Sequence, residues 1–380
     1  MPSTLTEEIA SSLRHQDYSL AVRRMLDACL DTNDQPLVRE AIQWSRQFRN
    51  WETSPKGSAP DAVFLEKADV LLKRAQQTLS IASDHIVTLL QAHHISKTYS
   101  NSQFQLQPVD LAISSGEIIG IVGENGNGKT TLLRCLGGQL ALDGGQIEFP
   151  RLSSPDRFAI RNYIAFIPQR IPRWYGKLKD NLHFSASIAG IHGEENHLMV
   201  DFMLERLNLS QYAELNWNQI SSGYRTRFEI ARILLQKPKL LILDEPLANL
   251  DINAQQTILT DLRFMAKSAH HAMGVILSSQ QLHEVEKVAD NVLFIKQGAC
   301  LFQSGKEEMS GQVMELETSA PRERLLEILG ADTVQIQFNG GFFTISATTI
   351  TVQQMIVKLL QQDVPISYFR DITKSTKRFF

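Results

Sequence analysis

Residues 123–131 read GENGNGKTT, and this glycine-rich stretch constrains the chain more than any other part of its sequence. Glycine allows successive backbone N–H groups to turn toward one anion, because no Cβ atom stands in the way. The apolar run EIIGIV precedes the stretch, and TTLLRCL follows it as a helix that would present its positive end to the loop. We therefore predict a strand, a phosphate-binding loop and a helix in succession, rather than an ordinary glycine turn.

The spacing within this loop assigns roles to its residues. Gly123 is followed by four residues and then by Gly128, Lys129 and Thr130, which is the spacing of a phosphate loop. The Lys129 ammonium can reach the β- and γ-phosphates of a nucleotide, and the Thr130 hydroxyl can ligate Mg²⁺. The other nucleotide contacts predicted in the loop are Asn125, Gly126, Asn127 and Thr131.

A second part of the site is expected at LLILDEP, residues 240–246, which has the pattern of a buried parallel strand that ends in acids. Asp244 can complete the Mg²⁺ shell, and Glu245 can orient and polarise an attacking water. Two acids that only cap the next helix are the alternative, and the glycine loop makes it the weaker one. A protein kinase is disfavoured, because neither His-Arg-Asp nor Asp-Phe-Gly accompanies the loop.

The middle of the chain is predicted to be an α/β domain. The chain has 380 residues, of which 43% are hydrophobic, so it can form two or three domains with packed cores. Apolar runs at 274–280 and 291–298 repeat the pattern of buried strands, and helical stretches lie between them. We predict one domain over residues 85–305, with a first strand at 85–92 and a mostly parallel sheet.

The two flanking segments have different patterns. Residues 1–84 carry apolar side chains at helical spacing, with breaks at 31–36 and 53–60, and predict a helical bundle for docking or regulation. Residues 306–380 follow the order β-α-β-β-α-β, with a hairpin around Asn339-Gly340, and predict a small ferredoxin-like α/β domain.

Charge, cysteine content and hydropathy exclude several classes of protein. The net charge of −3 disfavours a nucleic-acid partner, which usually requires a basic excess. Cys29, Cys135 and Cys300 are distant from one another and odd in number, so we expect a reducing compartment rather than a disulfide framework. The start of the chain lacks the pattern of a signal peptide, and no apolar run is long enough to predict a membrane span.

Motif order and spacing over roughly residues 86–300 resemble the ATP-binding cassette (ABC) ATPase family. Tyr99 of SKTY matches the aromatic residue that stacks on adenine, and Gln169 of IPQR matches the glutamine loop. ISSGYRTRFEIARILL (220–235) occupies the place of the family signature, and LANLD (247–251) that of the loop after the catalytic glutamate. The resemblance implies a P-loop fold that binds ATP and Mg²⁺, with Gln169 contributing to both catalysis and the metal shell.

The resemblance also implies a homodimer. In this family two cassettes face each other head to tail, and ATP lies between the phosphate loop of one and the signature of the other. Ser221 and Gly223 would therefore act on the ATP of the neighbouring copy. The implied function is ATP hydrolysis that energises a separate transmembrane permease from the cytoplasmic face of the membrane, and the C-terminal tail is similar to that of export-type cassettes. A soluble ABC ATPase or a slow ATP-dependent switch, acting without a permease, is the alternative.

Three positions depart from the family pattern. Ser222 stands where the signature has glycine, and Tyr224 replaces its glutamine. In ILSSQQLHEVEKVAD, Gln280 takes the place of the switch histidine, and His283 lies one helical turn later. Because a glutamine amide can donate a hydrogen bond but cannot take up a proton or a charge, we predict a catalytic site that closes around ATP and hydrolyses it more slowly than its histidine-bearing relatives.

The stretch after the glutamine loop is the place where the family meets its membrane partner. KDNLHF (179–184) resembles an element often found there. Trp174 and Tyr175 are candidates for a groove that binds the partner, because aromatic residues are enriched at the centres of interfaces. Simple packing within the protein is the alternative for both.

Overall fold

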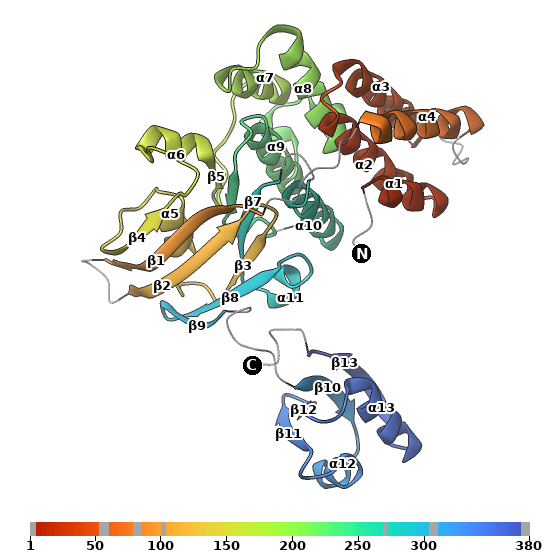
Figure 1. The fold of residues 1–380 in the computed structure, drawn as a ribbon, viewed down its shortest axis with the longest axis vertical. Helices are drawn as coiled ribbons and strands as arrows, with labels where there is room; N and C mark the ends of the chain where they lie inside the picture. The colour runs from red at the N-terminus through yellow and green to blue at the C-terminus, as the bar shows by residue number, and fades with distance from the viewer. Residues whose placement is uncertain are drawn as a thin grey trace.

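Short apolar runs form the strands of the central sheet, as is typical of parallel strands that are buried on both faces. The computed structural model describes residues 5–52, 61–78, 86–99, 104–248, 250–268, 272–303 and 311–373 (Figure 1). The six strands lie in the order β5-β6-β7-β3-β8-β9, and only β9 is antiparallel to its neighbour. They are β3 (Ile118–Val122), β5 (Ile164–Ile167), β6 (Leu240–Leu243), β7 (Gly274–Ser279), β8 (Asn291–Lys296) and β9 (Ala299–Gln303). The predicted mostly parallel sheet is therefore present.

A second, antiparallel sheet, which we did not predict as a separate layer, packs beside the first. It contains β2 (Gln105–Ser114), β1 (Thr88–Thr98) and β4 (Gly144–Glu148), in that order. The strand expected at 85–92 is the first part of β1. The helix after the glycine loop, α5 (Lys129–Leu136), shares one apolar core with both sheets. The helix that follows the loop is thus anchored to both sheets.

A group of helices follows β5 and leads into the predicted signature. It consists of α7 (Leu178–Ile188), α8 (Gly193–Arg206), the short turns Ser210–Tyr212 and Trp217–Gln219, and α9 (Ser222–Leu234). The shorter α6 (Arg157–Tyr163) precedes β5, while α10 (Ile252–Ala266) and α11 (Leu282–Val285) flank β7. The apolar faces of α7, α8, α9, α10 and α11 join the core on one side of the central sheet, whereas α6 packs against the core shared with the antiparallel sheet.

The C-terminal segment folds around a core of its own. Its elements are β10 (Gln312–Thr318), α12 (Arg322–Leu329), β11 (Val334–Asn339), β12 (Phe342–Ala347), α13 (Val352–Gln361) and β13 (Ile366–Asp371). The strands form an antiparallel sheet in the order β11-β12-β10-β13. Gly340 and Gly341 both have positive φ, as a two-residue hairpin turn of the primed type requires, so the predicted hairpin is present.

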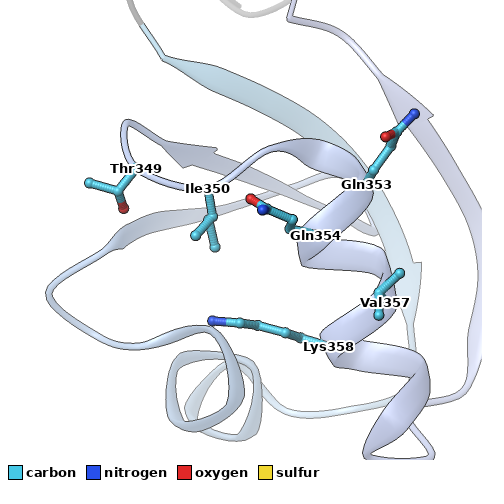
Figure 2. Close-up of a pocket in the computed structure, with 6 residues that line it drawn as sticks. All are labelled: Thr349, Ile350, Gln353, Gln354, Val357 and Lys358. Carbon is cyan, nitrogen blue, oxygen red and sulfur yellow. The ribbon is translucent and has the colours of Figure 1, made fainter.

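A shallow depression lies at the start of α13, apart from the glycine loop (Figures 1 and 2). Its lining residues are Thr349, Ile350, Gln353, Gln354, Val357 and Lys358. The side chain of Gln354 already takes part in a capping box with Thr351. Gln354 is therefore explained by the capping of α13, without a ligand in the depression.

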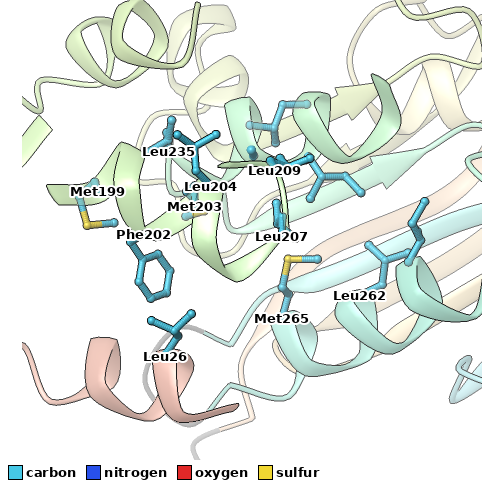
Figure 3. Close-up of a cluster of buried hydrophobic side chains, with 14 of the residues drawn as sticks. Leu26, Met199, Phe202, Met203, Leu204, Leu207, Leu209, Leu235, Leu262 and Met265 are labelled. Atoms are coloured by element: carbon cyan, nitrogen blue, oxygen red, sulfur yellow. The ribbon is translucent and has the colours of Figure 1, made fainter. Parts of the chain in front are cut away.

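The N-terminal helices pack against the cassette-like part of the chain. They are α1 (Leu5–Arg14), α2 (Tyr18–Asp31), α3 (Gln35–Glu52) and α4 (Ala62–Thr78). Helices α2 and α3 both contact α8, and Figure 3 shows Leu26 of α2 beside Phe202 of α8, in the same apolar cluster as Met265 of α10. The residues predicted at helical spacing, such as Met25 and Trp44, are buried in a core that is continuous with that of the central region. These helices are therefore packed onto the domain that follows them.

One buried carboxylate fastens α3 to α8. Glu205 is only 1% exposed, and its side chain accepts hydrogen bonds from Ser45 Oγ (3.2 Å), Arg46 Nε (3.2 Å) and Ser210 Oγ (2.8 Å). Arg49 Nε lies 2.6 Å from the same carboxylate. Because a buried charge is tolerated only with partners, this cluster requires α3 to stay on α8.

A second ionic cluster joins α2 to both α8 and α10. Asp27 accepts a hydrogen bond from Arg206 Nε at 2.7 Å and another from Arg24 Nη1 at 3.1 Å. Asp261 of α10 accepts a hydrogen bond from Arg23 Nη1 at 3.2 Å. Burial lowers the pKa of Arg24 to about 9, although Asp27 acts in the opposite direction. Helix α2 therefore bridges two elements that belong to different parts of the central region.

The two predicted domain boundaries, at 84/85 and 305/306, fall outside the described residues, as do the break at 53–60 and Asn249 of LANLD. Both boundaries stay predictions. In the part of the chain that the structure describes, every helix is too short or too polar to cross a bilayer.

Candidate functional site

The glycine loop connects β3 to α5 as predicted, and two of its glycines are required sterically. Gly128 has φ 104°, and a Cβ at this position would lie 2.6 Å from a ring carbon of Phe104. A Cβ at Gly123 would lie 2.3 Å from the carbonyl oxygen of Ile295. The cradle thus exists because these two positions have no side chain.

The loop is anchored to the turn between β8 and β9. Gln297 N–H donates to Asn127 Oδ1 at 2.9 Å, and Gly298 N–H donates to the Asn127 carbonyl at 3.1 Å. Asn125 and Gly126 lie on the exposed part of the loop, and Gly126 has φ 81°. The Asn127 side chain therefore fixes the shape of the loop, a role that its sequence position did not reveal.

Lys129 is buried, and its ammonium lies inside the loop. Nζ donates to the carbonyl oxygens of Gly123 (2.6 Å) and Glu124 (3.2 Å) and lies 3.1 Å from Glu245 Oε1. The first helical bond of α5 runs from Leu132 N–H to the Gly128 carbonyl. The N–H groups of the preceding turn therefore have no carbonyl within the helix, which is the geometry that binds anions at helix N-termini.

The two acids at the end of β6 face the loop. Asp244 Oδ2 accepts a hydrogen bond from Thr130 Oγ1 at 2.8 Å, so the hydroxyl and the carboxylate predicted for Mg²⁺ lie together. A second hydroxyl, Ser278 Oγ of β7, donates to Asp244 Oδ1 at 2.9 Å. Oxygen donors of this kind fit Mg²⁺, which prefers few protein ligands and keeps several waters. Gln169, also predicted for the metal shell, donates through Nε2 to Glu245, and its place in the metal shell stays a prediction.

Glu245 is held by three donors. Gln169 Nε2 and Gln280 Nε2 donate to its Oε2 at 2.8 Å and 2.9 Å, and Lys129 approaches Oε1. Its φ of 47° is uncommon for a residue with a side chain, which marks a locally strained position. The structure thus brings the three predicted catalytic residues, Glu245, Gln280 and Gln169, into one hydrogen-bonded group with the lysine of the loop.

The segment around Gln280 agrees with the alignment made from the sequence. Gln280 directly follows β7, whereas His283 lies in α11 with an exposed side chain. Ser279 Oγ donates to Glu284 Oε2 at 2.5 Å and accepts a hydrogen bond from Gln281 N–H at 3.0 Å, which fixes the entry to α11. Gln280, and not His283, is therefore the residue beside Glu245.

Tyr99, predicted to stack on adenine, lies at the start of α5. Its hydroxyl is 3.3 Å from Thr131 Oγ1, and its ring is 6.4 Å from that of Phe104, measured between centroids. Two aromatic rings therefore border the loop. Phe104 was missed in the sequence, because a single phenylalanine near a strand carries no distinctive signal.

The predicted signature forms the start of α9. Ser221 is the N-cap residue, and the exposed Ser221 and Ser222 precede Gly223 at the helix N-terminus. The ring of Tyr224 instead packs on Tyr212, with 4.0 Å between centroids, and Arg227 lies over it. A hydrogen bond with Tyr224 raises the pKa of Tyr212 to about 12. Tyr224 is thus engaged within its own protomer.

The two aromatic candidates for a partner groove differ in exposure. Trp174 is buried, stacks on Trp217 with 5.1 Å between centroids and donates to Glu229, so its prediction as a partner contact is wrong. The reason is local packing: Trp174 fills the space between Trp217 and Phe228. Tyr175 is 79% exposed.

Comparison with known proteins gives the family. The family model described as "ABC transporter" matches residues 106–248. The uncharacterized ABC transporter ATP-binding protein YxlF of Bacillus subtilis is 30% identical over 59% of this chain and 73% of that protein. The phosphonates import ATP-binding protein PhnC of Treponema denticola is 28% identical over 60% of this chain and 94% of that protein.

A solved structure agrees with these relatives. That of cbiO1 from Clostridium perfringens, described as part of the ABC transporter complex cbiONQ, covers 57% of this chain and 88% of its own, with 27% identity and a TM-score of 0.52. The predicted resemblance is confirmed by these matches and by the geometry of the loop and acids. The chain belongs to the family of ATP-binding proteins of ABC transporters, a family of P-loop ATPases.

Proposed function

We propose that this chain binds ATP and Mg²⁺, pairs with a second copy around the nucleotide, and hydrolyses ATP to energise a separate membrane permease. The observation that carries this proposal is the meeting of Lys129, Thr130, Asp244 and Glu245 at one end of the central sheet. These groups provide a cation for phosphate, two oxygen donors for a metal and a carboxylate for water. Their arrangement joins two segments that are far apart in the sequence, the start of α5 and the end of β6.

Each residue of the site would have a distinct role in binding or hydrolysis. The loop N–H groups and Lys129 would bind the phosphates, and Thr130 and Asp244 would hold Mg²⁺, which supplies charge neutralisation when bound. Binding of phosphate would compete for Lys129, whose ammonium now neutralises Glu245. Glu245 would then be free to accept a proton from water, while Gln169 and Gln280 keep its Oε2 in place.

Pairing of two copies is supported by the exposed start of α9. Ser221 and the N–H groups around Gly223 lie at a helix N-terminus that faces solvent in one protomer, as a site acting on the ATP of a neighbour requires. Glu245→Gln should bind ATP without turning it over and therefore accumulate a dimer, measured by light scattering with ATP and Mg²⁺. A Glu245→Gln chain that stays monomeric at saturating ATP contradicts the sandwich.

We further propose that Gln280 makes hydrolysis slow. It donates to Glu245 through an amide, and an amide cannot take up a proton during the reaction. Gln280→His should raise kcat with little change in ATP affinity. A lower or unchanged kcat, in a variant that still binds ATP, removes the proposal.

Coupling to a permease is supported by three exposed apolar side chains in the segment that follows the glutamine loop in the sequence, which we call the apolar strip. Tyr175, Phe184 and Ile188 are 79%, 67% and 67% exposed, and all lie between Gln169 and the signature. Large exposed apolar side chains of this kind are typical of interaction sites. We place the chain on the cytoplasmic face of the membrane, with the permease over this strip and without a nucleic-acid partner.

The test for a permease is co-fractionation. The chain should sediment with membranes when co-expressed with its polytopic partner, and Phe184→Glu should release it, while Phe158→Glu, at a 75% exposed position on α6, serves as the matched control. A wild-type chain that does not sediment with membranes would favour the second candidate, a soluble ABC ATPase or switch without a permease. Equal release of both variants, or none, would contradict the placement of the permease over Phe184. Export as the direction of transport stays a prediction.

We propose a ferredoxin-like C-terminal domain and an N-terminal helical domain that braces the cassette. The β-α-β-β-α-β order and the sheet order β11-β12-β10-β13 support the first proposal. The buried carboxylate of Glu205 and the partly exposed carboxylate of Asp27 support the second, because both join the N-terminal helices to α8. A docking role would then use the outer face of α4, where Val63 and Val70 are exposed.

A further inference from the structure

Ser278 is one of two buried serines, with Ser279, that end a strand whose other residues are apolar. All six residues of β7 are buried, and Ser278 is 0% exposed between β6 and β3. A hydroxyl in such a place lowers stability unless both of its hydrogen-bonding functions find partners. Its partners therefore indicate why a hydroxyl stands there.

Both partners belong to the acidic pair. Ser278 Oγ donates to Asp244 Oδ1 at 2.9 Å and accepts the backbone N–H of Glu245 at 2.9 Å. The backbone of Asp244 still follows the sheet ladder, since its N–H donates to the Ile167 carbonyl. Glu245 has turned into the left-handed region, so its N–H leaves the ladder and meets the hydroxyl instead.

We propose that Ser278 is a positioning residue for the ATPase site, an inference that rests on the proposed function. The hydroxyl oxygen of Ser278 fixes two groups. It orients the carboxylate of Asp244, which is assigned to the metal shell, and it holds the backbone of Glu245, whose carboxylate is assigned to water. The other oxygen of Asp244 is bonded to Thr130, whose hydroxyl is needed for Mg²⁺. When Thr130 turns to the metal, Ser278 continues to hold Asp244 in place.

The hydroxyl can be tested with a pair of variants that have the same shape. Ser278→Thr retains the hydroxyl and Ser278→Val replaces it with a methyl group, and both β-branched side chains suit a strand. Each is made in the Glu245→Gln background, which retains the N–H of residue 245. Mn²⁺ affinity is measured by electron paramagnetic resonance in the presence of ATP, and ATP affinity is measured separately in EDTA.

Ser278→Val should bind Mn²⁺ about tenfold more weakly than Ser278→Thr, as expected when a hydrogen bond to a charged group is lost. ATP affinity in EDTA should be the same in both, because the loop and Lys129 are untouched. With Glu245 restored, kcat of Ser278→Val should also fall at least about tenfold below that of Ser278→Thr, and excess Mn²⁺ should recover only part of it.

Equal Mn²⁺ affinity and equal kcat in the two variants would overturn the proposal. Equal losses of Mn²⁺ affinity and kcat in both variants relative to the wild type would also overturn it, because the volume of the side chain and not its hydroxyl would then be the cause. Failure of the proposed function is distinguishable: a wild-type chain that binds ATP and Mn²⁺ without hydrolysis contradicts the ATPase, while the difference in Mn²⁺ affinity still tests Ser278.

Discussion

Replacing Glu205 by alanine should loosen the N-terminal helices from the cassette more than any change on the surface of α8. The side chain is 1% exposed and faces Arg49, which is 18% exposed, so the pair is largely screened from water. Desolvation is the main cause that lowers the pKa of Arg49, with Glu205 opposing it. Removing the carboxylate takes the nearest counter-charge away from this guanidinium, while its hydrogen bonds to Asn208 and to the backbone carbonyl of residue 205 remain.

The magnitude follows from burial. Breaking a buried pair by removing one partner costs about 3–5 kcal/mol. Arg46, the other cation on Glu205, is 48% exposed and adds little. The hydroxyls of Ser45 and Ser210 lose an acceptor as well, but water replaces part of these hydrogen bonds when α3 moves away. We therefore expect the lower end, about 3 kcal/mol, or roughly a hundredfold in the opening equilibrium of α3.

Hydrogen exchange of the full chain measures this opening, because local protection reports the free energy of separating one unit from another. Amides of α3 and the end of α8 should exchange roughly a hundredfold faster in Glu205→Ala. Glu194→Ala is the matched control on the same helix: Glu194 is 92% exposed in its pair with Arg39, so its loss should change exchange less than about fivefold.

A double variant sharpens the test. Glu205→Leu with Arg49→Met removes both charges, and replacing a buried pair by apolar groups is often close to neutral. Protection of α3 should then return in large part. If Glu205→Ala exchanges no faster than Glu194→Ala, or if the double variant is as open as Glu205→Ala, the N-terminal helices are not fastened by this charge.

Three further outcomes are expected. Lys129→Ala should abolish tight ATP binding, seen by calorimetry, because phosphate loses the buried ammonium inside the loop; retained affinity would contradict the assignment of the loop. Trp174→Ala should destabilise the chain by about 3–5 kcal/mol in urea unfolding, with Tyr175→Ala as the exposed control, because only Trp174 is buried between Trp217 and Phe228. Burial raises the pKa of the Cys29 and Cys135 thiols to about 12 and about 11, from 9.0, so neither should react with iodoacetamide at pH 8 in the native chain. Because the folded-state pKa values of both thiols are raised, the stability that the protonated thiols contribute is complete below pH 9 and is lost as pH rises toward 11 and 12. Rapid alkylation of these thiols in the native chain at pH 8 would refute their burial.

The local sequence was sufficient to predict the elements whose conformation depends on a few neighbouring residues. The glycine loop, the buried strands β3, β6 and β7, and the C-terminal hairpin follow from glycine conformation and apolar patterning, which act over a few residues. These features needed no knowledge of distant parts of the chain. The order of the motifs also implied the pairing of Thr130 with Asp244, which the structure shows at 2.8 Å although the two residues are far apart in the sequence.

Only the tertiary structure decided which distant groups share a site or a core. Ser278 reads as part of an apolar strand until β7 is seen beside β6, where its hydroxyl meets both acids. Trp174 reads as an interface residue until Trp217 covers it. The N-terminal segment reads as a separate bundle until Glu205 is found to accept hydrogen bonds from α3. In each case the deciding interaction joins residues far apart in the chain, and burial and hydrogen bonding of that kind leave no periodic trace in the sequence.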